Sequence, residues 1–294
     1  MSNRVNDGKD HEMSATQVKA ERTLQVPGAT LHYELRGSGP VLLCISGGPT
    51  DAGAFDDLAA RLSDRYTVVA YDQRGHSRST LDGEPEDIPV AVHADDAAAI
   101  LAAVADEPAY VYGNSGGGTI GLELATRYPE RVRALVAHEA PLMELLPDAA
   151  RWRAAFEEIS ETYGKEGVFA AMGKFGAVVE EGGPKYSEEM QAVEPTPESE
   201  AMMARMAGNF DLFVAHEIRP IVGYVPDVDA LRSVSTRIVS AAGETSGEQA
   251  ARRASVALAE RLGIAATDLP GAHGGWGADP EELAAKIDEA LQAA

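Results

Sequence analysis

One serine of this chain, Ser115, has the sequence surroundings of a nucleophile. It lies at the centre of Gly-Asn-Ser-Gly-Gly (113–117), a G-x-S-x-G pattern that follows a run rich in valine and tyrosine and precedes a helical stretch ending near Pro129. On so sharp a turn from strand to helix, the serine hydroxyl projects out of the sheet, and the flanking glycines let neighbouring backbone pass close by. The backbone N–H of Gly116 then points at the same place as the serine oxygen and is predicted to be one oxyanion donor. Ser115 is therefore predicted to be a catalytic nucleophile.

A glycine-rich chain can produce this pattern by chance, so the prediction needs independent support. The first support is the apolar run 41–45, typical of a parallel strand covered on both faces, which leads directly into Ser46-Gly47-Gly48-Pro49. A glycine pair after a central strand can present backbone N–H groups to an anion. The N–H of Gly48 is predicted to be a second oxyanion donor, and a plain tight turn is the alternative.

The second support is a histidine in the glycine-rich stretch 270–276. His273 follows the last predicted strand, where a base must lie to reach a serine raised at the carboxyl edge of the sheet. A serine hydroxyl is a weak nucleophile until a histidine accepts its proton and backbone donors hold the oxyanion that forms. The order Gly48, Ser115, His273 therefore predicts nucleophilic acyl transfer.

The elements that must position these residues alternate between short apolar runs and helical patterns, which predicts an α/β fold with a mostly parallel sheet flanked by helices. Residues 1–22 are polar and are predicted to be a disordered tail. Residues 23–141 and 228–294 form the predicted core. Residues 142–227 have helical periodicity without a clear strand and are predicted to be an inserted helical cap, in which 179–187 is a loop. The large apolar residues of the predicted cap form either part of the core or a wall for apolar ligands: Met172, Phe175, Met190, Met202, Met203, Met206, Phe210 and Phe213.

Composition excludes several classes of function. The 25 Lys and Arg against 47 Asp and Glu give a net charge of −22, so nucleic acid and anionic membrane surfaces are excluded as partners. The single cysteine, Cys44, lies in an apolar run and is predicted to be a packed, inert thiol, which leaves no disulfide and no cysteine-based metal site. The sequence has no apolar run long enough for a membrane span and no signal-peptide core, which predicts a cytoplasmic protein.

Four motifs together resemble the alpha/beta-hydrolase superfamily over about residues 24–291. They are the S-G-G-P loop, Asp72-Gln73-Arg74-Gly75-His76-Ser77, the G-N-S-G-G turn and the G-A-H-G-G loop of His273. In the second motif, Asp72 and Arg74 are predicted to join adjacent loops and His76 to be structural. The D-Q-R-G segment and the glycine pair are similar to the proline iminopeptidase branch. However, Ser46 replaces the histidine of that branch and Gly116 replaces its aromatic residue, so peptidase activity is not transferred.

The resemblance implies an acid that orients His273, and two glutamates are candidates. Family members usually place the acid in G-x-x-D after the strand at 237–242, but here the segment is Gly243-Glu244-Thr245-Ser246. Haloalkane dehalogenases place it after the strand that follows the nucleophile's helix, where this chain has Glu139. Glu139 is the favoured acid and Glu244 is the alternative. If Glu139 has no catalytic role, it is expected to be a loop carboxylate that caps nearby backbone N–H groups.

The combined prediction is a serine hydrolase that cleaves a small carboxylic ester or lactone through an acyl-serine, without a metal or organic cofactor. One alternative is amide or aminopeptidase cleavage, with Glu180, Glu181 and Glu188 holding the substrate amine. The other is a binding protein that has the fold without the chemistry. The sequence leaves the oligomeric state and the natural substrate open.

Overall fold

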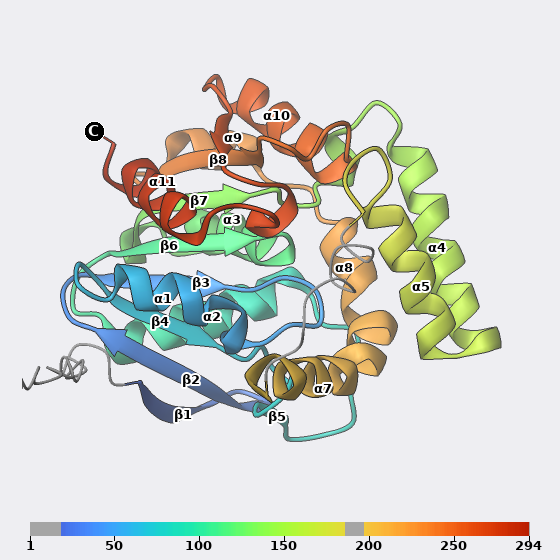
Figure 1. Ribbon diagram of the computed structural model, residues 1–294, viewed down its shortest axis with the longest axis horizontal. Helices are drawn as coiled ribbons and strands as arrows, with labels where there is room; N and C mark the ends of the chain where they lie inside the picture. Colours follow the sequence, from blue (N-terminus) through green and yellow to red (C-terminus); the bar gives the residue numbers. More distant parts are fainter. Residues whose placement is uncertain (1–18, 186–196, 294) are drawn as a thin grey trace, which may run out of the picture.

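The computed structural model describes residues 19–185 and 197–293, which form a twisted sheet between two layers of helices (Figure 1). The sheet has nine strands among these residues. In spatial order they are β1 (Ala20–Val26), β2 (Ala29–Gly37), β4 (Thr67–Tyr71), β3 (Val41–Ile45), β6 (Ala109–Asn114), β7 (Val132–His138), β8 (Arg237–Gly243) and β9 (Thr267–Leu269), and β5 (Thr80–Leu81) pairs with β2.

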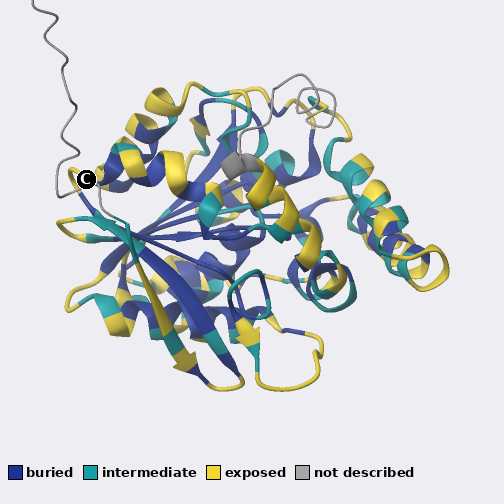
Figure 2. Ribbon diagram, turned by 60° about the horizontal axis from the view of Figure 1, so that its bottom comes forward, coloured by how far each residue is buried: buried dark blue, intermediate teal, exposed yellow. Residues whose placement is uncertain are grey.

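Strand β2 is antiparallel to β1 and β4, whereas every neighbouring pair from β4 to β9 is parallel. Parallel neighbours require crossover connections, and the helices that supply them cover both faces of the sheet. Alternate residues of β3 show this: Leu43 and Ile45 belong to one buried cluster, and Leu42 and Cys44 to the other. Figure 2 shows the central strands buried and the outer faces of the helices exposed.

The two helical layers have different members. One face of the sheet packs against α1 (Asp56–Leu62) and α11 (Pro280–Gln292). The other packs against α2 (Val90–Val104), α3 (Gly116–Arg127) and α10 (Ala250–Leu262). This three-layer arrangement brings the carboxyl ends of β3, β6, β7 and β8 to one edge of the sheet, so the loops that follow these strands meet there.

Residues 142–227, which lie between β7 and β8, are called the cap below. Its described residues form helices and no strand: α4 (Ala149–Glu166), α5 (Val168–Val179), α7 (Pro197–Leu212), a π-helix (Phe213–Glu217) and α8 (Ile218–Val222). A further helix, α9 (Val228–Ser233), leads into β8. Figure 1 shows α4, α5 and α8 beyond the carboxyl ends of β6 and β7. The division of the chain into separate core and cap domains stays a prediction.

Three expectations about element boundaries need correction. Strand β1 begins at Ala20, so residues 20–22 belong to the sheet, while residues 1–18 of the expected tail lie outside the described residues. Pairing with β2 supplies the hydrogen bonds there, although the β1 sequence carries little apolar signal. The two-residue strand β5 was not predicted, because so short a strand has no periodicity. Helix α5 includes Val179, so the expected loop begins one residue later, and its residues 186 and 187 lie outside the described ranges.

Two expectations from composition can be compared with the fold. Cys44 is free and fully buried in β3, and burial raises the pKa of its thiol, as expected for an inert side chain. Within residues 19–185 and 197–293, the structure contains no helix that combines the length and the apolar character needed to span a membrane.

Candidate active site

Ser115 lies between β6 and α3 with strained backbone angles, φ 53° and ψ −127°. A residue other than glycine rarely adopts a positive φ, so the surrounding structure must impose this backbone conformation on Ser115. Two glycines make the turn possible: a Cβ on Gly113 would lie 2.3 Å from the Gly117 carbonyl oxygen, and a Cβ on Gly117 would lie 1.9 Å from that of Ile45. The G-x-S-x-G spacing therefore has a steric cause in this structure, and the turn holds the Ser115 side chain at the end of the strand.

The loop after β3 lies against this turn. A Cβ on Gly47 would come within 2.6 Å of the Ser115 Cβ and 2.7 Å of the Gly116 nitrogen, so only glycine allows this approach. Gly48 has φ +59°, and a Cβ there would meet nothing within 4 Å. Among the described residues, the backbone N–H groups of Gly48 and Gly116 have no acceptor. Both glycines line one cavity, where two free donors can receive an anionic oxygen.

His273 and Glu139 are in direct contact. The Nδ1 of His273 lies 2.7 Å from Oε2 of Glu139, and Oε1 of Glu139 accepts the Gly243 N–H at 2.8 Å. Glu139 is completely buried at the end of β7 and, like Ser115, has a positive φ of 49°. Burial opposes ionisation of Glu139. The hydrogen bond and charge of His273, together with the Ser246 hydroxyl, outweigh this effect and lower the pKa of Glu139 to about 2. Glu139 is thus ionised at neutral pH, and its contact with His273 is made through the Nδ1 atom of the ring.

The alternative acid, Glu244, has a different environment. It follows Gly243 at the end of β8 but its side chain is exposed, and its backbone N–H bonds to the Leu269 carbonyl. Ser246, at the position of the usual aspartate, is fully buried and is one of the groups that lower the Glu139 pKa. The structure therefore places Glu139 rather than Glu244 against His273, and the site of the usual acid supplies a hydroxyl beside it.

The lowered pKa of Glu139 makes a prediction about stability. A carboxyl whose folded pKa lies below its unfolded pKa stabilises the fold above the unfolded value, and this contribution is lost as pH falls. We expect the difference in free energy of unfolding between the wild type and Glu139→Gln to shrink by roughly 2 kcal/mol between pH 6 and pH 3. Urea denaturation at several pH values measures it, with the exposed Glu244→Gln as control. A difference that stays constant over this range would contradict the prediction.

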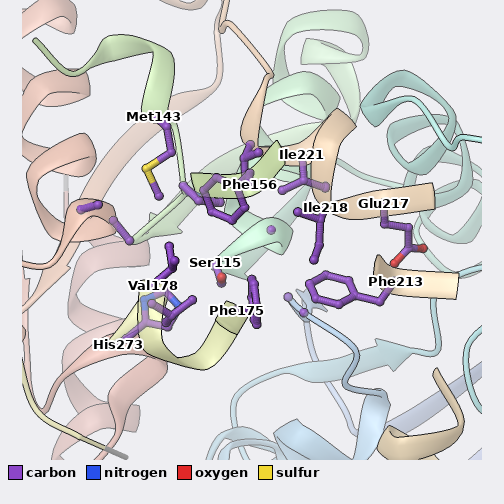
Figure 3. A pocket seen from close by; sticks show the side chains of 18 of the residues that line it. Ser115, Met143, Phe156, Phe175, Val178, Phe213, Glu217, Ile218, Ile221 and His273 are labelled. Carbon is purple, nitrogen blue, oxygen red and sulfur yellow. The ribbon is translucent and has the colours of Figure 1, made fainter. Parts of the chain in front are cut away.

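The cavity above Ser115 has mostly apolar walls. Figure 3 shows Ser115 and His273 on one side of it and Glu217 on the other. The cavity has a volume of about 50 Å³, enough for a small acyl group. Of the large apolar cap residues singled out from the sequence, Phe175 and Phe213 line it, and Met190 lies outside the described residues. The other apolar side chains of the walls include Met143, Phe156, Val178, Val179, Ile218, Ile221 and Val222.

Sequence reasoning missed two buried polar residues that line this cavity. Gln73 donates to the Ser46 carbonyl at 2.7 Å and so holds the loop after β3. Glu217 is buried in the π-helix of the cap, with Oε2 2.8 Å from Nε2 of His76. Gln73 could have been noticed because it lies in the D-Q-R-G motif. No local pattern marks Glu217, since its position depends on how the cap folds back onto the core.

The structural roles expected for the D-Q-R-G-H-S loop are confirmed. Arg74 binds both carboxylate oxygens of Asp96 on α2, at 2.7 and 2.6 Å, and Asp72 accepts the Ala52 N–H at 2.9 Å. His76 is fully buried, and its contact with Glu217 raises its pKa despite the opposing effect of burial. These contacts join the loop to α2, to the segment that follows β3 and to the π-helix of the cap.

One group of side chains in the described ranges has the spacing of metal ligands, namely Glu21, His32 and Glu34. However, Lys19 lies 2.8 Å from one carboxylate oxygen of Glu34, and Arg78 binds the other. These cations already neutralise the carboxylate, so we assign no metal to this group.

This geometry can be compared with known proteins. Residues 40–210 match the sequence model of a family described as having the alpha/beta hydrolase fold. The chain belongs to the alpha/beta-hydrolase family. As an alpha/beta hydrolase it has the strand-turn-helix at Ser115, the parallel sheet and the histidine loop in the order that the sequence resemblance implied. The predicted fold class is therefore confirmed.

Several relatives of this alpha/beta hydrolase are known. It is 36% identical to an uncharacterized hydrolase of Bacillus subtilis, YraK, over 92% of this chain and 95% of the relative. It is similar in fold to a thermophilic esterase from Thermogutta terrifontis, with a TM-score of 0.69, 19% identity and coverage of 92% and 97% of the two chains. An enol-lactonase from Burkholderia xenovorans has a TM-score of 0.63 at 18% identity, covering 86% and 92%.

Proposed function

We propose that this protein is a serine hydrolase that cleaves a small carboxylic ester or lactone through an acyl-serine. One observation carries the proposal: strained Ser115, the His273–Glu139 contact and the unpaired N–H groups of Gly48 and Gly116 converge on a single apolar cavity. Each of these features is needed for acyl transfer, and chance does not bring them together. The proposed roles are nucleophile for Ser115, base for His273 and orienting acid for Glu139.

The proposed mechanism has two halves. In the first, the Ser115 oxygen attacks the substrate carbonyl carbon, its proton passes to the Nε2 of His273, and the oxyanion accepts hydrogen bonds from Gly48 and Gly116. The tetrahedral intermediate then collapses, and His273 returns the proton to the departing alcohol oxygen. In the second half, a water molecule loses a proton to His273 and attacks the acyl-serine carbonyl. The second tetrahedral intermediate then collapses, releases the acid, and takes the proton from His273 back onto the Ser115 oxygen. Ionised Glu139 stabilises the imidazolium in both halves and fixes the ring orientation.

The walls of the cavity favour an uncharged, mainly apolar substrate. Glu217 is the acidic residue that lines it, and its carboxylate pairs with His76. Of the acidic residues proposed to hold a substrate amine, Glu180 and Glu181 do not line the cavity, and Glu181 pairs with Arg151. Glu188 lies outside the described residues. These contacts support ester or lactone cleavage over aminopeptidase activity.

The experiment that tests the proposal is hydrolysis of p-nitrophenyl esters of increasing acyl length, compared with an aminoacyl p-nitroanilide. We expect turnover of short acyl esters and at most weak turnover of the anilide. Preference for the anilide would contradict the proposal in favour of amide cleavage. A protein that neither hydrolyses these substrates nor reacts with a fluorophosphonate would instead be a binding protein with this fold.

Acyl length should depend on Phe175. Its ring packs edge-to-face on Phe213, with centroids 5.1 Å apart at 82°, and both rings line the cavity. We expect Phe175→Ala to enlarge the cavity, so that the preferred acyl chain lengthens by roughly two to four carbons while kcat/KM for acetate esters falls several-fold. Phe169→Ala on the same helix is the control, because Phe169 is 75% exposed. An unchanged acyl-length profile in Phe175→Ala would contradict this assignment of the wall.

A further inference from the structure

Cap helix α7 contacts the loop that carries Gly48. Arg205 and Asn209 lie four residues apart on α7, hence on one face of the helix. Arg205 binds Asp51, and Asn209 donates to the Pro49 carbonyl at 2.8 Å. Figure 1 shows α7 on the side of the cap toward β5, near the loops that precede that strand. The cap therefore contacts the oxyanion loop, residues 46–51, at two points just after Gly48.

Asn209 also binds a second core loop. Its Oδ1 accepts the Ser77 N–H at 2.7 Å, and its Nδ2 lies 3.0 Å from the Ser77 hydroxyl, which in turn donates to Asp51 at 3.0 Å. Ser77 is one of three non-glycine residues with positive φ in the described chain, and the other two are Ser115 and Glu139. Asn209 is 3% exposed, so water cannot replace these bonds. One amide side chain thus joins the two loops.

The remaining contacts of the oxyanion loop show why its conformation depends on outside partners. The Ser46 carbonyl accepts from Gln73 and the Gly47 carbonyl from the Thr50 hydroxyl, at 2.7 and 2.8 Å. Gly48 itself has φ +59° and open space where a side chain would be. Glycine has the greatest backbone freedom, so the direction of its N–H depends on the residues that hold its neighbours. Pro49, the next residue, is held by Asn209.

We propose that Asn209 is a positioning residue, which fixes Pro49 and Ser77 so that the Gly48 N–H points at the oxyanion. The inference rests on the proposed function of Ser115 and extends it, because it makes the oxyanion site dependent on the cap. An oxyanion donor is effective only within a narrow range of distance and direction. Loss of the Asn209 amide should therefore slow the chemical step and leave substrate binding nearly unchanged.

Two kinetic measurements test the proposal: kcat and KM for a short p-nitrophenyl ester, and the rate of inactivation by a fluorophosphonate. We expect Asn209→Ala to lower kcat and the inactivation rate roughly 10- to 100-fold, with KM changed less than about threefold. Asn209→Gln retains an amide and should recover part of the loss. Tyr163→Phe is the matched control, because it removes a hydroxyl that binds Asp211 on the same helix at 3.0 Å. Its rates should match the wild type.

The outcomes separate this proposal from the proposed function. Wild-type rates in Asn209→Ala, or a change confined to KM, would overturn the positioning role. If Asn209→Ala does not fold, Arg205→Gln at the half-exposed neighbouring contact must lower kcat several-fold, and wild-type kcat there would overturn the proposal. If the wild-type protein reacts with the fluorophosphonate but hydrolyses no ester, the substrate assignment fails and the inactivation rates still test Asn209. If it reacts with neither, the proposed function itself fails.

Discussion

Replacing Ser115 with alanine is expected to lower kcat for a short p-nitrophenyl ester by roughly 10⁴-fold or more. The variant keeps the backbone donors and the apolar walls, but it has no oxygen that can form the acyl intermediate. Residual hydrolysis would then come from binding and the oxyanion donors alone. Because glycines and neighbouring backbone impose the turn, alanine should occupy it without loss of the fold.

Steady-state kinetics with a matched control makes this measurement decisive. Ser233→Ala removes an exposed hydroxyl on α9 that bonds only to the Asp229 carbonyl among the described residues, and it should behave as the wild type. Circular dichroism confirms that both variants are folded. Ester turnover by Ser115→Ala within a few-fold of the wild type would show that another group performs the chemistry.

The second large effect is expected for Glu139→Gln, which should lower kcat roughly 10²- to 10⁴-fold. The amide can donate a hydrogen bond to the Nδ1 of His273, which would favour the tautomer whose Nε2 cannot accept the serine proton. It also removes the negative charge that stabilises the imidazolium. The Gly243 N–H still finds an amide oxygen as acceptor, so the buried site should remain hydrogen-bonded.

The matched variant is Glu244→Gln, which changes an exposed carboxylate at the end of the next strand. Its kcat should lie within about twofold of the wild type at every pH. Comparing the two variants over pH 5 to 9 separates loss of the orienting acid from a general loss of stability. A steep loss in Glu244→Gln together with normal activity in Glu139→Gln would reverse the assignment of the acid.

Local sequence determined much of the fold that holds the site. The apolar run of β3 indicates a strand that is buried on both faces, and the glycines around Ser115 meet the steric needs of the turn. Both features can be recognised in a short stretch of sequence. For the same reason the relation of Gly48 to the end of β3, and of His273 to β9, could be predicted. The order of these loops along one sheet edge then follows from parallel pairing.

Tertiary structure distinguishes the surroundings of Glu139 from those of Glu244. Both glutamates follow buried strands that end at the same edge of the sheet, so the pattern of apolar residues does not distinguish one candidate acid from the other. What separates them is direction: the positive φ of Glu139 accompanies a side chain buried against His273, whereas the Glu244 side chain is exposed to solvent. The sequence favoured Glu139 only through the family resemblance.

The cap could be predicted as helical but not as a set of contacts. Helical periodicity shows which residues share a face, and several faces of the cap are rich in methionine and phenylalanine. Which face meets the cavity depends on how α5, the π-helix and α8 pack together over Ser115. Asn209 and Glu217 have no sequence signature for the same reason, since their partners Pro49 and His76 lie more than a hundred residues away.

Mass spectrometry of the protein after reaction with a fluorophosphonate tests directly whether Ser115 is the nucleophile that forms the acyl-serine. We expect one phosphonyl group per chain, located on the peptide that contains Ser115, and loss of ester hydrolysis in proportion to labelling. Ser115→Ala should remain unlabelled. Modification of a different residue, or undiminished ester hydrolysis by fully labelled protein, would show that Ser115 is not the nucleophile.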